Sequence, residues 1–300
     1  MKKHGWLFVA VVCAAIGAAS CGDDDGGSTT PPPPPPGDGA VPPPPTDGAV
    51  PPPSGGSCPG DIGGGVCCAT ASNADRQDAP ELRLVGINIS APSALSNAAI
   101  ISLVQGAIDG QRFNWLMRLS GADGDGEFTI ETGAGERNSD GTYAFLGGEY
   151  PPQMFMGTLA GETWMTGSAA MTVSIPVFND DGSLLTVLPL DGLQVDTATL
   201  SEMRDCIGTR SGRRWTYGSP ESALTAYITV ASAREVQIEA LGMDLCSLLA
   251  GTNCMMPQSA WMNPPTAVCN GGACSGACDG TDNCAYEVNA SFAAAAVEIQ

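Results

Sequence analysis

Apolar and polar residues alternate along several segments of the chain, and this period of two predicts β-strands. The segments with the clearest apolar alternation are Val85, Ile87 and Ile89; Phe113, Trp115, Met117 and Leu119; Met171, Val173, Ile175 and Val177; and Tyr286, Val288, Ala290 and Phe292. A turn at Asp180-Asp181-Gly182 predicts a further strand over Leu184–Leu190. Because Pro176 has no backbone N–H to donate, the strand that contains it is expected at the edge of a sheet.

Two other segments carry apolar residues at helical spacing. The first has Ser96 or Asn97 as its N-cap and Gly110 at its end, and its stripe is Ile100, Leu103, Val104, Ala107 and Ile108. The second ends before Gly251, and its stripe is Ile238, Leu241, Leu245, Leu248 and Leu249. The run Ala293–Ala296 stays open, because alanine favours helix whereas the alternation before it favours strand. Few helices among many short strands and glycine-rich turns predict a mainly β fold, either a β-sandwich or a partly closed barrel with about two helical insertions.

The first twenty residues have the pattern of a secretory signal peptide. A positive segment, Lys2-Lys3-His4, precedes a mostly apolar stretch from Trp6 to Ala19 that ends in small residues. This stretch is shorter than the roughly 20 apolar residues that a membrane-spanning helix needs. An uncleaved anchor helix is the alternative.

Ala18-Ala19-Ser20-Cys21 resembles the bacterial lipobox, in which the cysteine is acylated and becomes the first residue of the mature protein. The last three residues match the motif, while Ala18 stands where the family prefers a larger aliphatic residue. Two or more acyl chains, such as palmitate, give stable anchoring where one chain is marginal. The resemblance implies a lipid anchor on Cys21, and Gly22 after it favours the outer membrane. The alternative is that Cys21 is an ordinary thiol.

Residues 22–57 contain no candidate core and predict a disordered stalk. Proline runs occupy 31–36, 42–45 and 51–53, and such runs favour extended polyproline II structure. We interpret the stalk as a spacer, with a ligand for an aromatic-lined groove as the alternative. The predicted organisation is a signal peptide at 1–20, the lipidated Cys21 and its stalk at 21–57, and a Cys-rich, mostly β globular domain at 58–300. No second low-complexity linker divides this last part, so one domain is favoured over two.

The charge of the chain excludes several classes of function. Twelve basic residues face thirty-two acidic ones, and the formal net charge is -20. Both lysines and the single histidine lie within the first four residues, so removal of the signal peptide leaves a chain without lysine or histidine. Histidine-dependent triads, histidine metal sites and lysine Schiff bases are therefore excluded. A chain this acidic repels phosphate backbones, so we expect no nucleic-acid partner.

The cysteines predict disulfides in an exported protein. Apart from Cys13 and Cys21, ten cysteines remain: Cys58, Cys67, Cys68, Cys206, Cys246, Cys254, Cys269, Cys274, Cys278 and Cys284. An even number in an exported chain indicates five disulfides. Adjacent Cys67 and Cys68 are expected to take different partners, and Cys206–Cys246 is the first pairing that we predict. The spacings among the last four cysteines are looser than those of zinc knuckles, so disulfides are favoured over a metal site.

Two acidic patterns give weak indications of chemistry. The segment 123–127 resembles the opening of a calcium loop, but Phe128 and Ala134 stand where the EF-hand pattern needs glycine and glutamate. An acidic turn is therefore the better interpretation. Glu127 and Glu131 share one face of a predicted strand, with backbones about 13 Å apart. Glycosidase carboxyl groups lie about 5–9.5 Å apart, so a solvated strand face is favoured over a catalytic pair.

Three of the ten arginines fall within five positions, beside two aromatic residues, and these five residues are the candidate ligand-binding site: Arg210, Arg213, Arg214, Trp215 and Tyr217. Guanidinium groups and aromatic rings suit carboxylates, phosphates or sugars. The alternative is a surface loop whose arginines pair with the protein's own carboxylates.

Three short segments are similar to Cys-rich outer-membrane lipoproteins of the myxobacterial kind: Asn88-Ile89-Ser90-Ala91-Pro92, Asp205-Cys206-Ile207-Gly208 and Phe292-Ala293-Ala294. The resemblance implies a lipid-anchored outer-membrane protein, on either its periplasmic or its cell-surface face, and brings no catalytic residues or cofactor. We therefore expect a non-enzymatic binding or surface-structural domain with a protein or carbohydrate ligand. A carboxylate-dependent envelope hydrolase, such as a glycosidase, is the alternative.

Overall fold

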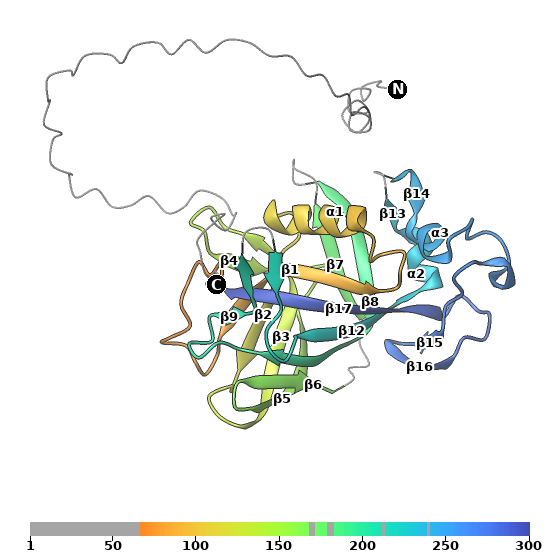
Figure 1. Cartoon of the computed structure of the whole chain (residues 1–300). Coiled ribbons are helices and arrows are strands. Elements are labelled where there is room, and N and C mark those ends of the chain that lie inside the picture. The colour runs from red at the N-terminus through yellow and green to blue at the C-terminus, as the bar shows by residue number, and fades with distance from the viewer. Residues whose placement is uncertain (1–66, 168–171, 179–182, 212–213, 239–240) are drawn as a thin grey trace, which may run out of the picture. The chain divides into compact units, whose positions relative to one another are not determined.

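A computed structural model describes residues 67–167, 172–178, 183–211, 214–238 and 241–300 (Figure 1). The signal peptide, Cys21, the stalk and the turn at 180–182 lie outside these residues. The described part is mainly β and contains three α-helices, as the alternation of apolar residues predicts. None of the described helices has the length and apolarity needed to cross a membrane.

Eight antiparallel strands pair edge to edge into a closed ring. In spatial order they are β1 (Glu81–Ala91), β2 (Trp115–Ser120), β3 (Gly126–Arg137), β5 (Gln153–Ala160), β6 (Thr163–Thr166), β8 (Leu184–Thr199), β12 (Ala223–Thr229) and β17 (Cys284–Ala296). The last strand closes the ring because it pairs with both β12 and β1. Of the two architectures expected, the chain adopts the barrel, since each of these eight strands pairs with a neighbour along part of both of its edges.

Shorter strands extend this ring. β4 (Tyr143–Phe145) pairs with β3, β7 (Thr172–Phe178) with β8, and β9 (Cys206–Ile207) with β17. β15 (Ala267–Asn270) joins β17 to β16 (Ala273–Ala277), and two separate hairpins are β10 (Thr209–Ser211) with β11 (Arg214–Thr216) and β13 (Gln237–Ile238) with β14 (Met243–Asp244). Among the described strands β7 pairs with β8 alone, so the edge position predicted from Pro176 is confirmed.

The interior of the ring is filled by apolar side chains. All four residues of the predicted alternation that begins just before β2 and runs through it are buried: Phe113, Trp115, Met117 and Leu119. Phe128 and Trp164 meet edge to face inside the ring, with centroids 5.9 Å apart. The early strand departs from simple alternation, because a register shift between Leu84 and Gly86 turns Val85 outward, into a separate cluster.

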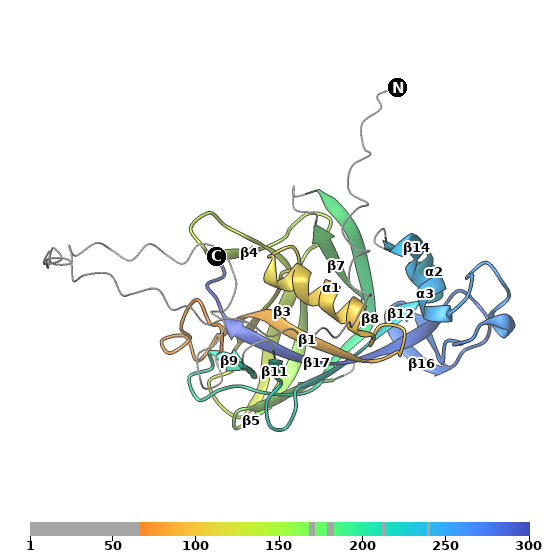
Figure 2. The same ribbon diagram turned by 45° about the horizontal axis from the view of Figure 1, so that its top comes forward.

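The first predicted helix is confirmed as α1 (Ala98–Asp109), which lies along β1 (Figure 2). The side-chain Oδ1 of Asn97 accepts a hydrogen bond from the N–H of Ile100 at 3.0 Å, and Gly110 follows the last turn. Ile100 and Ile108 pack into the main core. The N-cap and the apolar stripe are both encoded within this segment, so the local sequence was sufficient to predict the helix.

Only the second half of the second predicted helix is helical in the structure. Ile238 lies in β13, Gly242 adopts a positive φ of 64°, and α3 (Leu245–Ala250) begins only after Asp244. Leu241 is exposed, so the apolar stripe does not continue across the turn. The pattern also missed α2 (Val230–Glu235) and a short 3-10 helix at Gln258–Ala260. The ambiguous run Ala293–Ala296 is strand, because it pairs with β1.

Four disulfides lie within the described residues: Cys67–Cys206, Cys246–Cys254, Cys269–Cys274 and Cys278–Cys284. The predicted Cys206–Cys246 bond is wrong. Cys206 lies in β9 beside the end of β17, where the segment after Cys67 also binds. Cys246 is instead the second residue of α3 and bonds to Cys254 in the loop that follows that helix. Cys68 is disulfide-bonded too, so the adjacent cysteines take different partners as expected. Cys58 lies outside the described residues.

The packing of the ring generates a stability prediction at Gly157. A Cβ added there would lie 2.6 Å from the ring of Phe128 and 3.1 Å from Ile130. Gly157→Ala should therefore lower the free energy of unfolding by about 1–3 kcal/mol, since overpacking forces core side chains to shift. Urea denaturation measures this change. Gly124→Ala is the control, because a Cβ at Gly124 meets nothing within 4 Å; equal midpoints for the two variants would contradict the packing described.

Candidate functional site

The β10–β11 hairpin brings together two of the five candidate residues, Arg210 and Trp215. They face each other in the ladder, and the guanidinium carbon of Arg210 lies 5.6 Å from the centroid of the Trp215 ring. Figure 2 places β11 beside β17, on the outside of the ring. Arg213 lies outside the described residues, and Arg214 is exposed on the hairpin.

Trp215 packs against the ring itself. Its indole covers Gly86, where an added Cβ would lie 2.7 Å from the indole carbons. It belongs to an outer apolar cluster with Val85, Ala293 and Ala295. The missing side chain at Gly86 is thus what lets the indole approach the backbone of β1. The ring of Trp215 is therefore largely used for packing against the barrel.

Arg210 joins the hairpin to α1. Its Nη1 lies 3.8 Å from Oδ1 of Asp109, and the Arg210 side chain is 17% exposed. The side-chain amide of Gln105 donates to the same Asp109 oxygen and to the carbonyl of Val85, at 2.9 Å each. Arg210 thus pairs with one of the protein's own carboxylates, which was the alternative to ligand binding.

Tyr217 also contributes mainly to packing. Burial, together with the negative charge of Glu221, raises the pKa of the Tyr217 phenol to about 12. The phenol therefore stays protonated at neutral pH and is unsuited to act as a base. Of the described candidate residues, Arg214 remains the one whose side chain is presented to solvent.

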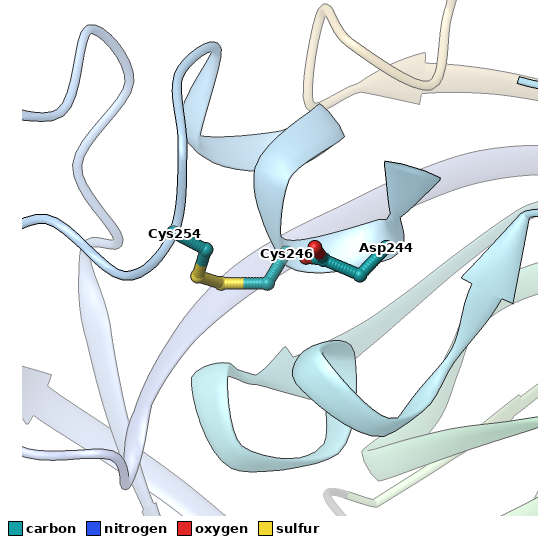
Figure 3. Close-up of side chains that lie close together, drawn as sticks. All are labelled: Asp244, Cys246 and Cys254. Atoms are coloured by element: carbon teal, nitrogen blue, oxygen red, sulfur yellow. A yellow bond between two sulfur atoms is a disulfide. The ribbon is translucent and has the colours of Figure 1, made fainter. Parts of the chain in front are cut away.

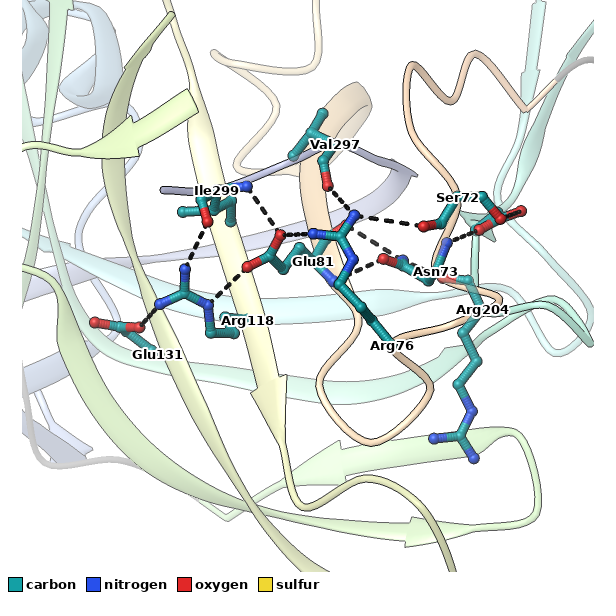
Figure 4. Close-up of polar contacts among 10 residues, drawn as sticks. Ser72, Asn73, Arg76, Glu81, Arg118, Glu131, Arg204, Val297 and Ile299 are labelled. Atoms are coloured by element: carbon teal, nitrogen blue, oxygen red, sulfur yellow. Dashed lines mark hydrogen bonds and ion pairs between the residues drawn. The ribbon is translucent and has the colours of Figure 1, made fainter. Parts of the chain in front are cut away.

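Sequence reasoning missed a polar network that centres on Glu81 at the start of β1 (Figure 4). Its side chain is 8% exposed. It pairs with Arg76, accepts from Nε of Arg118 at 3.0 Å, and accepts from the backbone N–H of Ile299 at 2.9 Å. The network thus fastens the C-terminal segment across β1 and β2. Finding it required the register that sets Glu81 opposite Arg118, which no local pattern reveals.

The same arginine accounts for Glu131. Nη1 of Arg118 donates to Oε2 of Glu131 at 2.9 Å, while its Nη2 donates to the carbonyl of Ile299 at 3.0 Å. Glu127, the other half of the candidate carboxylate pair, is exposed on β3. The Glu131 carboxylate is therefore already engaged in an ion pair within the fold. The arrangement therefore favours the solvated strand face over a catalytic pair.

One cluster in the described residues has metal-ligand composition: Asp244, Cys246 and Cys254 place their ligand atoms within 4.8 Å of one another (Figure 3). The two sulfur atoms are bonded to each other. Asp244 is the N-cap of α3, where its carboxylate accepts from the backbone N–H of Ser247 at 2.7 Å and from its hydroxyl at 2.9 Å. The disulfide and the helix cap together explain why these three side chains lie close to one another, and no ion is needed for it.

Comparison with known proteins assigns this chain to no family. No family model matches the chain, and neither a curated protein nor a solved structure matches it.

The Glu81 network generates a second stability prediction. Glu81→Gln should lower the free energy of unfolding by about 3 kcal/mol, because it leaves the two arginines without their buried counter-charge. Guanidinium chloride would itself screen the ion pairs, so urea denaturation is the suitable measurement. Glu127→Gln is the matched control, and its effect should stay within about 0.5 kcal/mol since the side chain is exposed. A loss at Glu81 no larger than at Glu127 would refute the buried role.

The β10–β11 hairpin generates a third stability prediction. Trp215→Ala should destabilise the domain by about 2 kcal/mol, because the outer face of β1 at Gly86 loses its cover. Arg214→Ala should leave the unfolding midpoint unchanged, since its side chain is exposed. Thermal melts followed by circular dichroism distinguish the two variants. If Trp215→Ala melts like the unaltered protein, the indole is free for a ligand and the structural role assigned to it is wrong.

Proposed function

We propose that this protein is a lipid-anchored protein of the bacterial outer membrane, with a non-enzymatic domain that binds a partner or serves as a surface structure. The proposal that the domain is not an enzyme rests on one observation. The polar clusters described above are tied into the fold itself, and the described interior of the ring is packed with apolar side chains. A hydrolase would need carboxylates free to face a substrate.

The anchor is inferred from the sequence. Cys21 at the end of the lipobox-like segment would carry the acyl chains, and residues 22–57 would hold the domain away from the lipid surface. The disulfides support an exported location, because such bonds persist in oxidising compartments and are rare in the cytosol. The resemblance to myxobacterial lipoproteins agrees with this placement.

The partner class follows from the surface. A net charge of -20 disfavours nucleic acid and anionic lipid headgroups as ligands of the domain. The exposed Arg214 is the described candidate residue still available to a carboxylate or sugar hydroxyl. A protein or carbohydrate ligand is therefore the class that we propose.

Substitution of Cys21 tests the anchor. Cells that express the protein should incorporate labelled palmitate into it, and Cys21→Ser should abolish the labelling and release the protein from the membrane fraction. Cys13→Ser is the matched control and should retain both, because Cys13 lies in the segment that would be removed. Mass spectrometry should find the mature N-terminus at Cys21.

Two outcomes would contradict the proposal. Intact protein that still carries His4 would exclude processing at Cys21. The membrane-extracted protein should also retain a ligand from a glycan or protein panel without converting it, so turnover of a glycan would favour the hydrolase.

A further inference from the structure

The longest stretch of the chain without a charged residue runs from Leu245 to Cys278. These 34 residues contain no Asp, Glu, Lys or Arg, whereas 15% of the whole chain is charged. The stretch comprises α3, the loop after that helix, and the β15–β16 hairpin, which lie at the same end of the barrel (Figures 1 and 2). Because the chain has a net charge of -20, this end carries a neutral region on a strongly acidic protein. We call the exposed part of the stretch 245–278 the neutral face.

Three methionines of the neutral face present apolar side chains to solvent. Met255, Met256 and Met262 have exposed fractions of 84%, 48% and 72%. Within the described residues, Met255 and Met262 are the two most exposed large apolar side chains. Methionine is more often found inside proteins, and exposed apolar clusters mark interaction surfaces. Its flexible thioether chain can adapt to the surface of a partner.

The loop that carries these methionines is fixed to the rest of the fold. The Trp261 indole is buried, and its N–H donates to the carbonyl of Met256 at 2.9 Å. The backbone N–H of Met262 donates to the carbonyl of Ala250 at 3.1 Å, at the end of α3. The disulfide Cys246–Cys254 ties the start of the loop to the same helix. The loop is therefore held at both ends, and its apolar side chains are presented from a built surface.

Most of the charged groups that flank the neutral face in the sequence are already bonded within the fold. Asp244 is the N-cap of α3, and Asp282 accepts from Nη1 of Arg234 at 2.6 Å. Asp279, which follows the stretch directly, accepts from the backbone N–H of Thr281 at 3.0 Å and stays exposed. A partner that covers the neutral face would therefore remove few charges from water, and the cost of burying it would be low.

The charge pattern favours a second copy of this chain as the partner. In a two-fold dimer a patch meets the same patch of the other copy, so each charge in it would face its like. Two chains that each carry a net charge of -20 can therefore approach most easily through a face without charge. A basic partner would instead be drawn to the acidic remainder of the surface.

A lipid surface is a weaker candidate for this face. Segments that lie in a membrane interface typically carry Lys and Arg on their polar side and Trp, Phe or Leu on their apolar side. The stretch 245–278 contains neither Lys nor Arg, and its Trp261 is buried.

The neutral face is also large enough for a dimer. Ten of its 34 residues are buried, so 24 are at least partly exposed. One side of a standard interface uses about 20–30 residues. We propose that this protein forms a two-fold dimer through the neutral face, with Met255, Met256 and Met262 as its apolar anchors. The dimer belongs to the barrel and does not depend on the lipid anchor.

Analytical ultracentrifugation tests the dimer. The full-length protein is sedimented in a neutrally buoyant detergent, with micelles in large excess so that acyl chains do not bring two copies into one micelle. We expect a concentration-dependent species with twice the mass of one chain. Raising the salt concentration should strengthen the dimer, because salt screens the repulsion between two acidic copies.

Two double variants locate the contact. Met255→Asp/Met262→Asp sets carboxylates of the two copies against each other and should weaken the association at least tenfold. Met154→Asp/Met156→Asp adds the same charge at two other exposed methionines, on β5, and should change the association less than twofold. A monomer at every concentration, equal weakening by both variants, or a dimer that salt weakens would overturn the proposal.

Hydrogen exchange of the unaltered protein locates the contact without any variant. The backbone amides of residues 251–264 should exchange more slowly at high than at low protein concentration. If zwitterionic lipid vesicles protect this loop while the protein is monomeric, the face binds lipid and the proposal is wrong. Concentration-dependent protection that is confined to another part of the barrel would assign the dimer to a different surface and would equally overturn it.

Discussion

The double pairing of β17 is the constraint on which the rest of the structure depends. This strand bonds to β12 along one edge and to β1 along the other, and so closes eight strands into a ring. Its last four residues are the alanine run Ala293–Ala296, buried throughout. Small side chains let Trp215 approach one face of this run closely, while the backbone of the run bonds to a segment near the start of the described chain. Trp215 covers one side, and the carbonyl of Ala296 accepts from the N–H of Thr70 at 2.9 Å.

Closure also explains why the polar residues have structural roles. Beyond β17 the chain continues past β1 and β2, and Ile299 reaches both Glu81 and Arg118 (Figure 4). An ion pair removed from water is costly unless further hydrogen bonds complete it, and the backbone of Ile299 supplies these. The charges therefore secure the C-terminal segment.

Features encoded within a few residues could be predicted from the sequence. Asn97, Gly110 and one apolar stripe were enough for α1, and alternation was enough for β2. Features that depend on distant partners could not. Helical spacing continued from Ile238 to Leu249 because a local pattern does not register the turn at Gly242. The partner of Cys206 depends on which segment runs beside β9, so spacing alone pointed to the wrong cysteine.

The candidate site also shows that a local sequence pattern does not reveal which residues the fold uses for packing. Arg210 and Trp215 stood out because charged and aromatic residues are rare in this chain, yet the fold uses them to attach a hairpin to the ring. The methionines of β5 would pass as core residues in a sequence. The inner face of that strand is instead formed with Gly157, whose missing side chain makes room for the ring of Phe128. Because the glycine faces inward, Met154 and Met156 on the same strand face solvent, so an apolar pattern that would predict core residues places two methionines on the surface.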